Sequence, residues 1–126
     1  MDHFKYFNDT FGHQAGDEVL RTVASVLRRN VRESDIAGRY GGEEFGVVLV
    51  NTRADAAVYF AERLRKEIEK ATVTMDGRVL QVTVSLGVAA LTPAIANHQE
   101  WIEQADLALY RAKNAGRNRV SGAEES

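Results

Sequence analysis

Residues 36–50 read IAGRYGGEEFGVVLV, and this stretch predicts a β-hairpin. The short apolar runs at 36–40 and 45–50 are typical of strands. Between them, Gly41-Gly42 permits a tight reversal with positive backbone φ. We therefore expect two antiparallel strands joined by a turn that carries two adjacent carboxylates.

Amphipathic helices are predicted on both sides of this hairpin. Residues 16–30 place apolar side chains at three- and four-residue spacing, which is typical of a helix with one buried face. The same spacing recurs over residues 57–68, opposite a charged face. The apolar positions are Val19, Leu20, Val23, Val26 and Leu27 in the first helix, and Ala57, Phe60, Ala61, Leu64 and Ile68 in the second.

A second hairpin and a last helix complete the chain. Asp76-Gly77 is a strong turn signal, and the alternation of apolar with polar or small residues over 82–88 predicts that the second half of this hairpin is a core strand. A helix around Trp101 is expected to end near Gly116 in a left-handed cap. Residues 121–126 are interpreted as a flexible tail.

The order helix, hairpin, helix, hairpin, helix favours an α+β fold, with helices packed on a sheet. At 126 residues the chain has the size of one domain, which we place at residues 1–120. No apolar strand precedes the first helix, so one strand of a βαββαβ unit is missing from the chain.

Composition excludes several classes of protein. The net charge of −2 gives no broad attraction to DNA or RNA. No cysteine is present, so a disulfide framework or thiolate metal site is excluded. No signal peptide or membrane-length apolar stretch occurs, so we expect a cytoplasmic domain without direct membrane contact.

Two places in the sequence carry polar groups suited to chemistry. Glu43 and Glu44 repel each other unless a cation or a proton-transfer task compensates, and Mg²⁺ binds through one or two carboxylates plus substrate phosphates. The alternative is a solvated acidic hairpin tip. In the segment 2–17, Lys5 can meet a phosphate, while Asn8 and Asp17 can match the edge of guanine.

Ordinary structural roles remain open for the residues of that segment. Asp17 can be a helix-capping or first-turn acid, Asn8 a turn former and Lys5 a solvated cation. Taken singly, each residue fits such a role at least as well as it fits a binding site.

The order of several motifs resembles one family closely. The runs DHFKYFNDTFGHQAGDEVL, RESDIAGRYGGEEF, VTVSLGVA and ADLALYRAKNAGRN are similar to the GGDEF domain of diguanylate cyclases, in its GGEEF variant, over nearly the whole chain. The resemblance implies a palm-like nucleotidyl-cyclase sheet and a bacterial signalling enzyme. In that family two domains, each holding one GTP and divalent cations, meet as a homodimer and form cyclic di-GMP and two pyrophosphates.

The resemblance also implies roles for particular residues. Glu43 and Glu44 are catalytic and, with the Met1 backbone carbonyl, hold Mg²⁺ or Mn²⁺. The residues that bind GTP are His3, Phe4, Lys5, Asn8, Asp17, Gly42, Lys113 and Arg117. Lys113 and Arg117 are four residues apart, so on a helix both reach the phosphates. The alternative for this pair is a basic helix end favoured by the helix dipole.

A second ligand site is implied by the RxxD pattern of Arg32 and Asp35, which resembles the family's inhibitory cyclic di-GMP site. Arg63 on the second predicted helix is placed to help. An upstream sensor or receiver domain is expected in the parent protein.

The chain departs from the family in one respect. Family members carry a helix, a strand and a metal-binding Asp ahead of this segment, at positions that would precede Met1. We therefore expect weaker magnesium binding, and a chain that is compromised or dimerises by strand exchange. The alternative function is a catalytically inactive module that binds cyclic di-GMP or GTP.

Overall fold

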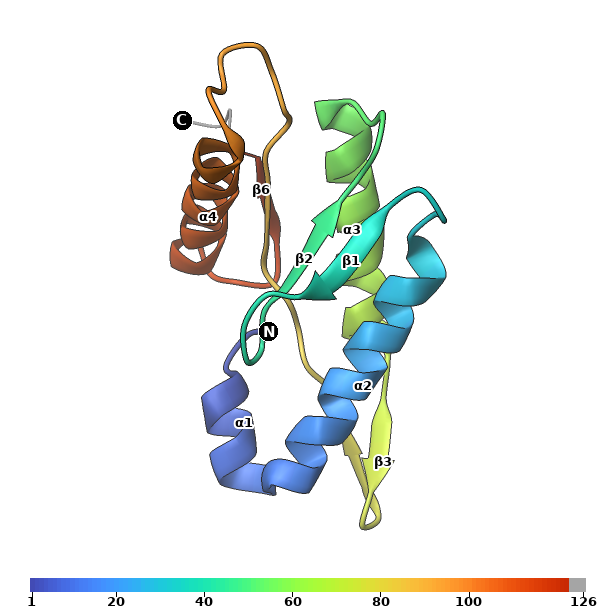
Figure 1. The fold of residues 1–126 in the computed structure, drawn as a ribbon. Coiled ribbons are helices and arrows are strands. Elements are labelled where there is room, and N and C mark those ends of the chain that lie inside the picture. Colours follow the sequence, from blue (N-terminus) through green and yellow to red (C-terminus); the bar gives the residue numbers. More distant parts are fainter. Residues whose placement is uncertain (123–126) are drawn as a thin grey trace.

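The computed structural model describes residues 1–122 and has an α+β fold, as the sequence predicts. Figure 1 shows the N-terminal end near the middle of the molecule, beside the loop between the first two strands. The helices are α1 (Phe4–Phe11), α2 (His13–Asn30), α3 (Ala54–Lys70) and α4 (His98–Asn114); the strands are β1 (Ile36–Arg39), β2 (Phe45–Val48), β3 (Val73–Met75), β4 (Arg78–Leu80), β5 (Leu86–Val88) and β6 (Val120–Gly122).

The strands pair two by two. β1 and β2 are antiparallel, with Ile36 opposite Val48, so the first predicted hairpin is confirmed. β3 and β4 are antiparallel around Asp76 and Gly77, whose φ values of 50° and 76° are those of a tight hairpin turn. β5 and β6 are parallel.

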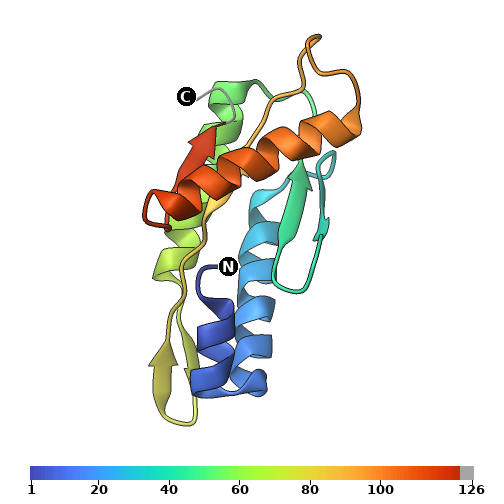
Figure 2. The same ribbon diagram turned by 90° about the vertical axis from the view of Figure 1, so that its left-hand side faces the viewer.

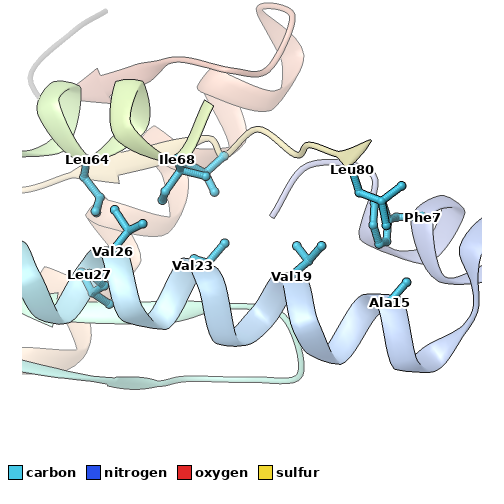
Figure 3. Close-up of a cluster of buried hydrophobic side chains, with 10 residues drawn as sticks. Phe7, Ala15, Val19, Val23, Val26, Leu27, Leu64, Ile68 and Leu80 are labelled. Carbon is cyan, nitrogen blue, oxygen red and sulfur yellow. The ribbon is translucent and has the colours of Figure 1, made fainter. Parts of the chain in front are cut away.

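The core lies between α2 and α3. Figure 3 shows Val26 and Val23 of α2 pointing toward Leu64 and Ile68 of α3, with Val19 on the same side of α2 one turn away. Val19 is only 1% exposed. Each such side chain contributes roughly 1.5–3 kcal/mol to the stability of the fold when it is fully buried. The packing of α2 against α3 therefore stabilises the part of the molecule from which the loops extend. Both predicted amphipathic faces are confirmed.

Helix α4 packs closely on the parallel pair of strands. Figure 2 shows α4, in orange, passing across β6, in red, and across the gold segment that precedes α4 in the sequence. A Cβ atom on Gly87 of β5 would lie 2.1 Å from the Ala105 carbonyl oxygen of α4. Only glycine permits so close an approach. Gly116 has the positive φ expected of a helix cap, at 124°, and Arg117 N–H donates to the Ala112 carbonyl at 3.0 Å.

Two expectations about the later part of the chain are corrected. The second hairpin ends at β4, and residues 82–88 are not its second half, because β3 is only three residues long and offers no partner beyond Leu80. Instead β5 pairs with β6. Ser121 and Gly122 belong to β6 and Ser121 is buried, so the tail does not begin at residue 121. The rest of the expected tail, 123–126, lies outside the described residues.

Residues 4–11 form helix α1, so Asn8 lies within a helix and its alternative role as a turn former is wrong. The apolar positions Phe4, Phe7 and Phe11 follow helical spacing, and the first two are buried. Gly12, at φ 92°, separates α1 from α2, which begins at His13 rather than near residue 16. Within residues 1–122, none of the helices combines the length and apolarity that a bilayer crossing requires.

Candidate functional site

The N-terminal turn presents free backbone donors. His3 precedes α1 in a left-handed conformation, with φ 56°, and no side chain caps the helix. The first N–H groups of a helix lack partners within it, so an anion can bind there. His3 and Lys5 are exposed, whereas the Phe4 side chain is buried, so only the backbone of Phe4 is available to a ligand.

Asn8 carries a buried acceptor without a partner. Its Oδ1 atom is the single buried side-chain polar atom in residues 1–122 that makes no hydrogen bond. Such an atom costs roughly 1–3 kcal/mol unless a ligand donates to it. Asp17 lies nearby on α2, next to Gly16, and its side chain is exposed. Because Asp17 is the fifth residue of α2, its alternative role as a helix cap or first-turn acid is wrong.

Glu43 and Glu44 lie in the loop between β1 and β2. Both are exposed, and across the described part of the chain their carboxylates make no hydrogen bond or ion pair. The loop closes through Tyr40 N–H, which donates to the Glu44 carbonyl at 2.8 Å. The expectation of positive φ at Gly41 and Gly42 is wrong, because this wider loop, braced by Arg39 on the Gly42 carbonyl, does not need a two-residue reversal.

This loop meets the N-terminal turn. The Met1 ammonium donates to the Glu43 carbonyl at 3.2 Å, and Figure 1 shows the N-terminal end beside the loop. Burial is the main cause that lowers the pKa of this ammonium, and Lys113 of α4 lowers it further. The charges of Asp2, Glu43 and Glu44 oppose the shift. Predicted metal-binding and phosphate-binding residues from three parts of the chain therefore lie in one neighbourhood.

The available ligands suit Mg²⁺ only in part. Residues 1–122 contain no group of three acidic, histidine or cysteine side chains placed to hold a metal. Glu43 and Glu44 are free carboxylates, and Mg²⁺ is often held by one or two carboxylates together with substrate phosphates. The residues therefore fit a magnesium ion that a nucleotide helps to bind.

Lys113 and Arg117 do not share a helix as predicted. Lys113 lies in the last turn of α4, whereas Arg117 follows the helix end with φ 64°. The Arg117 guanidinium makes no hydrogen bond or ion pair with any described residue, so it is available to a ligand. The next residue, Asn118, also has a left-handed φ, of 48°.

Asp2 was not identified from the sequence as a site residue. It is only 6% exposed, and its carboxylate accepts hydrogen bonds from Thr83 Oγ1 at 2.7 Å, Ser85 Oγ at 2.6 Å and Asn118 N–H at 3.0 Å. Burial by itself raises the pKa of Asp2, but these hydrogen bonds and the adjacent ammonium lower it below 3.8 overall. The alternation over 82–88 places Thr83 and Ser85 away from the apolar face, but nothing in the pattern names their partner.

The predicted inhibitory site is held together by its own residues. The Asp35 side chain is only 2% exposed and accepts from Arg32 N–H at 2.9 Å and from Val50 N–H at 3.1 Å. The hydrogen bond from Arg32 N–H is the largest cause that lowers the pKa of Asp35. The Arg32 guanidinium also reaches the Val50 carbonyl at 2.8 Å. Arg63 donates to Asn30 Oδ1 at 3.0 Å, two residues before Arg32.

The chain is similar to known proteins over nearly its whole length. The sequence profile described as "Diguanylate cyclase, GGDEF domain" matches residues 1–119. Diguanylate cyclase A of Treponema denticola is 47% identical over 121 residues, covering 96% of this chain and 33% of its own length. The response regulator PleD of Caulobacter vibrioides is 44% identical over 124 residues, which are 97% of this chain and 27% of PleD.

Solved structures agree with the fold. The GGDEF domain of DgcB from Caulobacter crescentus, in complex with c-di-GMP, has a TM-score of 0.93 at 41% identity and covers 98% of this chain and 74% of that one. The active GGEEF domain of a diguanylate cyclase from Vibrio cholerae has a TM-score of 0.90 at 34% identity, covering 99% and 79%. The chain spans about a third or less of the curated relatives. Since the profile covers almost all of it, the chain belongs to the diguanylate cyclase GGDEF domain family.

Proposed function

We propose that this domain condenses two GTP molecules into cyclic di-GMP and two pyrophosphates. The observation that carries the proposal is the convergence of free Glu43 and Glu44, Lys113 and the uncapped N-terminal turn around Met1. Relatives named diguanylate cyclases support the same chemistry.

Guanine selection is assigned to Asn8 and Asp17. The orphaned Asn8 Oδ1 is an acceptor ready for an N–H group, and the exposed Asp17 carboxylate can accept from the N–H groups of guanine. A binding site with unpaired polar atoms discriminates strongly between ligands, because a ligand that cannot form the matching hydrogen bonds leaves those atoms buried and unsatisfied. We therefore expect GTP to be preferred over ATP.

The triphosphate is assigned to the turn at His3 and Phe4 and to Lys5, Lys113 and Arg117. A Cβ atom on Gly42 would meet nothing within 4 Å, so the loop leaves open space beside the carboxylates for a ligand. Mg²⁺ or Mn²⁺, when bound by Glu43, Glu44 and the Met1 carbonyl, would neutralise phosphate charge.

The reaction itself is a phosphoryl transfer. The 3′-hydroxyl of one GTP attacks the α-phosphorus of the other, a new O–P bond forms and the bond to pyrophosphate breaks. Glu44 takes the proton of the 3′-hydroxyl. Each domain holds one nucleotide, so the two bonds form only when two copies face each other as a homodimer.

Regulation and setting extend the proposal. Arg32, Asp35 and Arg63 would bind the product and inhibit the enzyme, and a relative that is a response regulator supports an upstream receiver or sensor domain. We place the domain in the cytoplasm, because its proposed substrate GTP is available there. The second candidate is a receptor that binds cyclic di-GMP or GTP without turnover. The lack of a three-ligand metal group in residues 1–122 favours this candidate.

The test is incubation with GTP and Mg²⁺, followed by mass-resolved chromatography for cyclic di-GMP. We expect Glu43→Gln and Glu44→Gln to form about a hundredfold less product than the unsubstituted chain, since transition-state charge stabilisation is worth several kcal/mol. Arg28→Ala, on the exposed face of α2, is the control for altered charge. Binding of GTP without any product would favour the receptor.

A further inference from the structure

Asp2 joins the N-terminal turn to two distant segments, residues 83–85 and the turn at Asn118, and Asn118 is 116 residues away in the sequence. Its N–H donates to the Thr83 carbonyl at 3.0 Å, while its carboxylate accepts from Thr83, Ser85 and Asn118. A buried carboxylate is costly unless its oxygens are satisfied, and here three donors from two segments converge on it.

On one side, Asp2 controls the start of the phosphate turn. His3 follows it directly and has the left-handed φ of 56° that opens α1. Because both the backbone and the side chain of Asp2 are bound to Thr83, the position of the first amide groups of α1 depends on residues 83–85.

On the other side, Asp2 holds the turn that carries Arg117. Arg117 and Asn118 are consecutive non-glycine residues with left-handed φ, a conformation that persists only when the surroundings fix it. Asp2 fixes the Asn118 backbone, and α3 fixes its side chain: Arg65 Nη1 donates to Asn118 Oδ1 at 3.0 Å, and Asn118 Nδ2 donates to Glu69.

We propose that Asp2 is a positioning residue that sets the two phosphate-contacting turns, His3–Phe4 and Arg117–Asn118, at a fixed separation. The proposal rests on the proposed function, because it gives Asp2 a role in binding the triphosphate and none in reading guanine. Asp2 itself does not touch the ligand, since its carboxylate is filled by protein donors.

The experiment compares two ligands by calorimetry: guanosine, and a GTP analogue with a methylene group between the α- and β-phosphorus atoms. For Asp2→Ala we expect about tenfold weaker binding of the analogue, the loss of roughly one charged hydrogen bond, with guanosine affinity within about twofold of wild type. Asp2→Asn should stay within about threefold for both ligands, because its oxygen can accept from Thr83 and Asn118 while its amide donates to Ser85.

The same kind of substitution at an exposed threonine of β3, Thr74→Val, is the matched control. It leaves every donor to Asp2 in place, so analogue binding should stay within about twofold of wild type. If Asp2→Ala does not fold, Asp2→Ser replaces it, since its short hydroxyl cannot span the donors. If Asp2→Ala or Asp2→Ser leaves the affinity for the analogue unchanged, or lowers the affinity for both ligands equally, the positioning role of Asp2 is overturned and the proposed function is not. Failure of the wild-type chain to bind either ligand overturns the proposed function, and the role of Asp2 with it.

Discussion

A Cβ atom on residue 16 would lie 1.7 Å from Oδ1 of Asn8, so glycine at this position is what allows the Asn8 amide to pack against α2. Gly16→Ala should therefore displace Asn8. We expect a loss of about 1–3 kcal/mol in unfolding free energy from overpacking, and weaker GTP binding. Thermal or urea unfolding and calorimetry with GTP measure the two effects.

The double variant Asn8→Ala/Gly16→Ala separates the clash from other effects. With the Asn8 side chain removed, the alanine at 16 has room and gains up to about 1 kcal/mol of helix propensity. The double variant should then be at least as stable as Asn8→Ala alone. Gly38→Ala, where a Cβ meets nothing within 4 Å, is the control at an open glycine. Lower stability of the double variant would contradict this account.

Gly87→Ala should be strongly destabilising. The new Cβ would lie 2.1 Å from the Ala105 carbonyl oxygen and 2.4 Å from Leu109 N, both backbone atoms of α4 that cannot rotate away. We expect a cost of about 3 kcal/mol, at the upper end for overpacking, and a correspondingly lower Tm. A Tm equal to that of Gly46→Ala, at another open glycine in a strand, would count against the close packing of α4 on β5.

Arg32→Ala should weaken the proposed binding of cyclic di-GMP at little cost to the fold. The Arg32 side chain is 60% exposed, and Asp35 keeps its hydrogen bonds from the backbone N–H groups of Arg32 and Val50. We expect a loss of less than about 1 kcal/mol in stability, but at least tenfold weaker binding of cyclic di-GMP. Unfolding and calorimetry measure both, with Arg28→Ala as the control. Unchanged affinity would remove Arg32 from the proposed inhibitory site.

Asp35 should make stability depend on pH in acid. Its pKa is lowered from 3.8 in the folded chain, first by the Arg32 N–H, so its contribution is fully present above 3.8 and is lost as the pH falls through the lower folded value. Asp35→Asn should therefore be less stable than wild type at neutral pH, and the difference should shrink below pH 3.8. Urea unfolding at several pH values measures this, and a difference independent of pH would argue against it.

The sequence was sufficient for the elements that repeat a simple pattern. The helical faces at Val19, Val23, Leu64 and Ile68 were predicted because burial on one side leaves a three- and four-residue period. Both hairpin turns were located from glycine pairs or Asp-Gly. These signals are local, so one stretch of sequence contains the whole of each.

Features set by contacts between distant segments were not predicted. Helix α1 was missed because its phenylalanines occupy only two turns and its polar residues were interpreted as a turn. Strand β6 has no hydrophobic alternation and exists because β5 lies beside it. The burial of Asp2 depends on Asn118, and no pattern near either residue reveals the other.

The same link between Asp2 and Asn118 sets the order in which the molecule can be assembled. Contacts between distant residues form late, because the loop between them must close first. During synthesis, the helices α2 and α3 can pack before residue 118 has been translated, but the hydrogen bond between Asp2 and Asn118 cannot yet form. In a nascent chain on the ribosome, the N-terminal turn therefore stays unattached to the Arg117–Asn118 turn until nearly all of these residues have emerged.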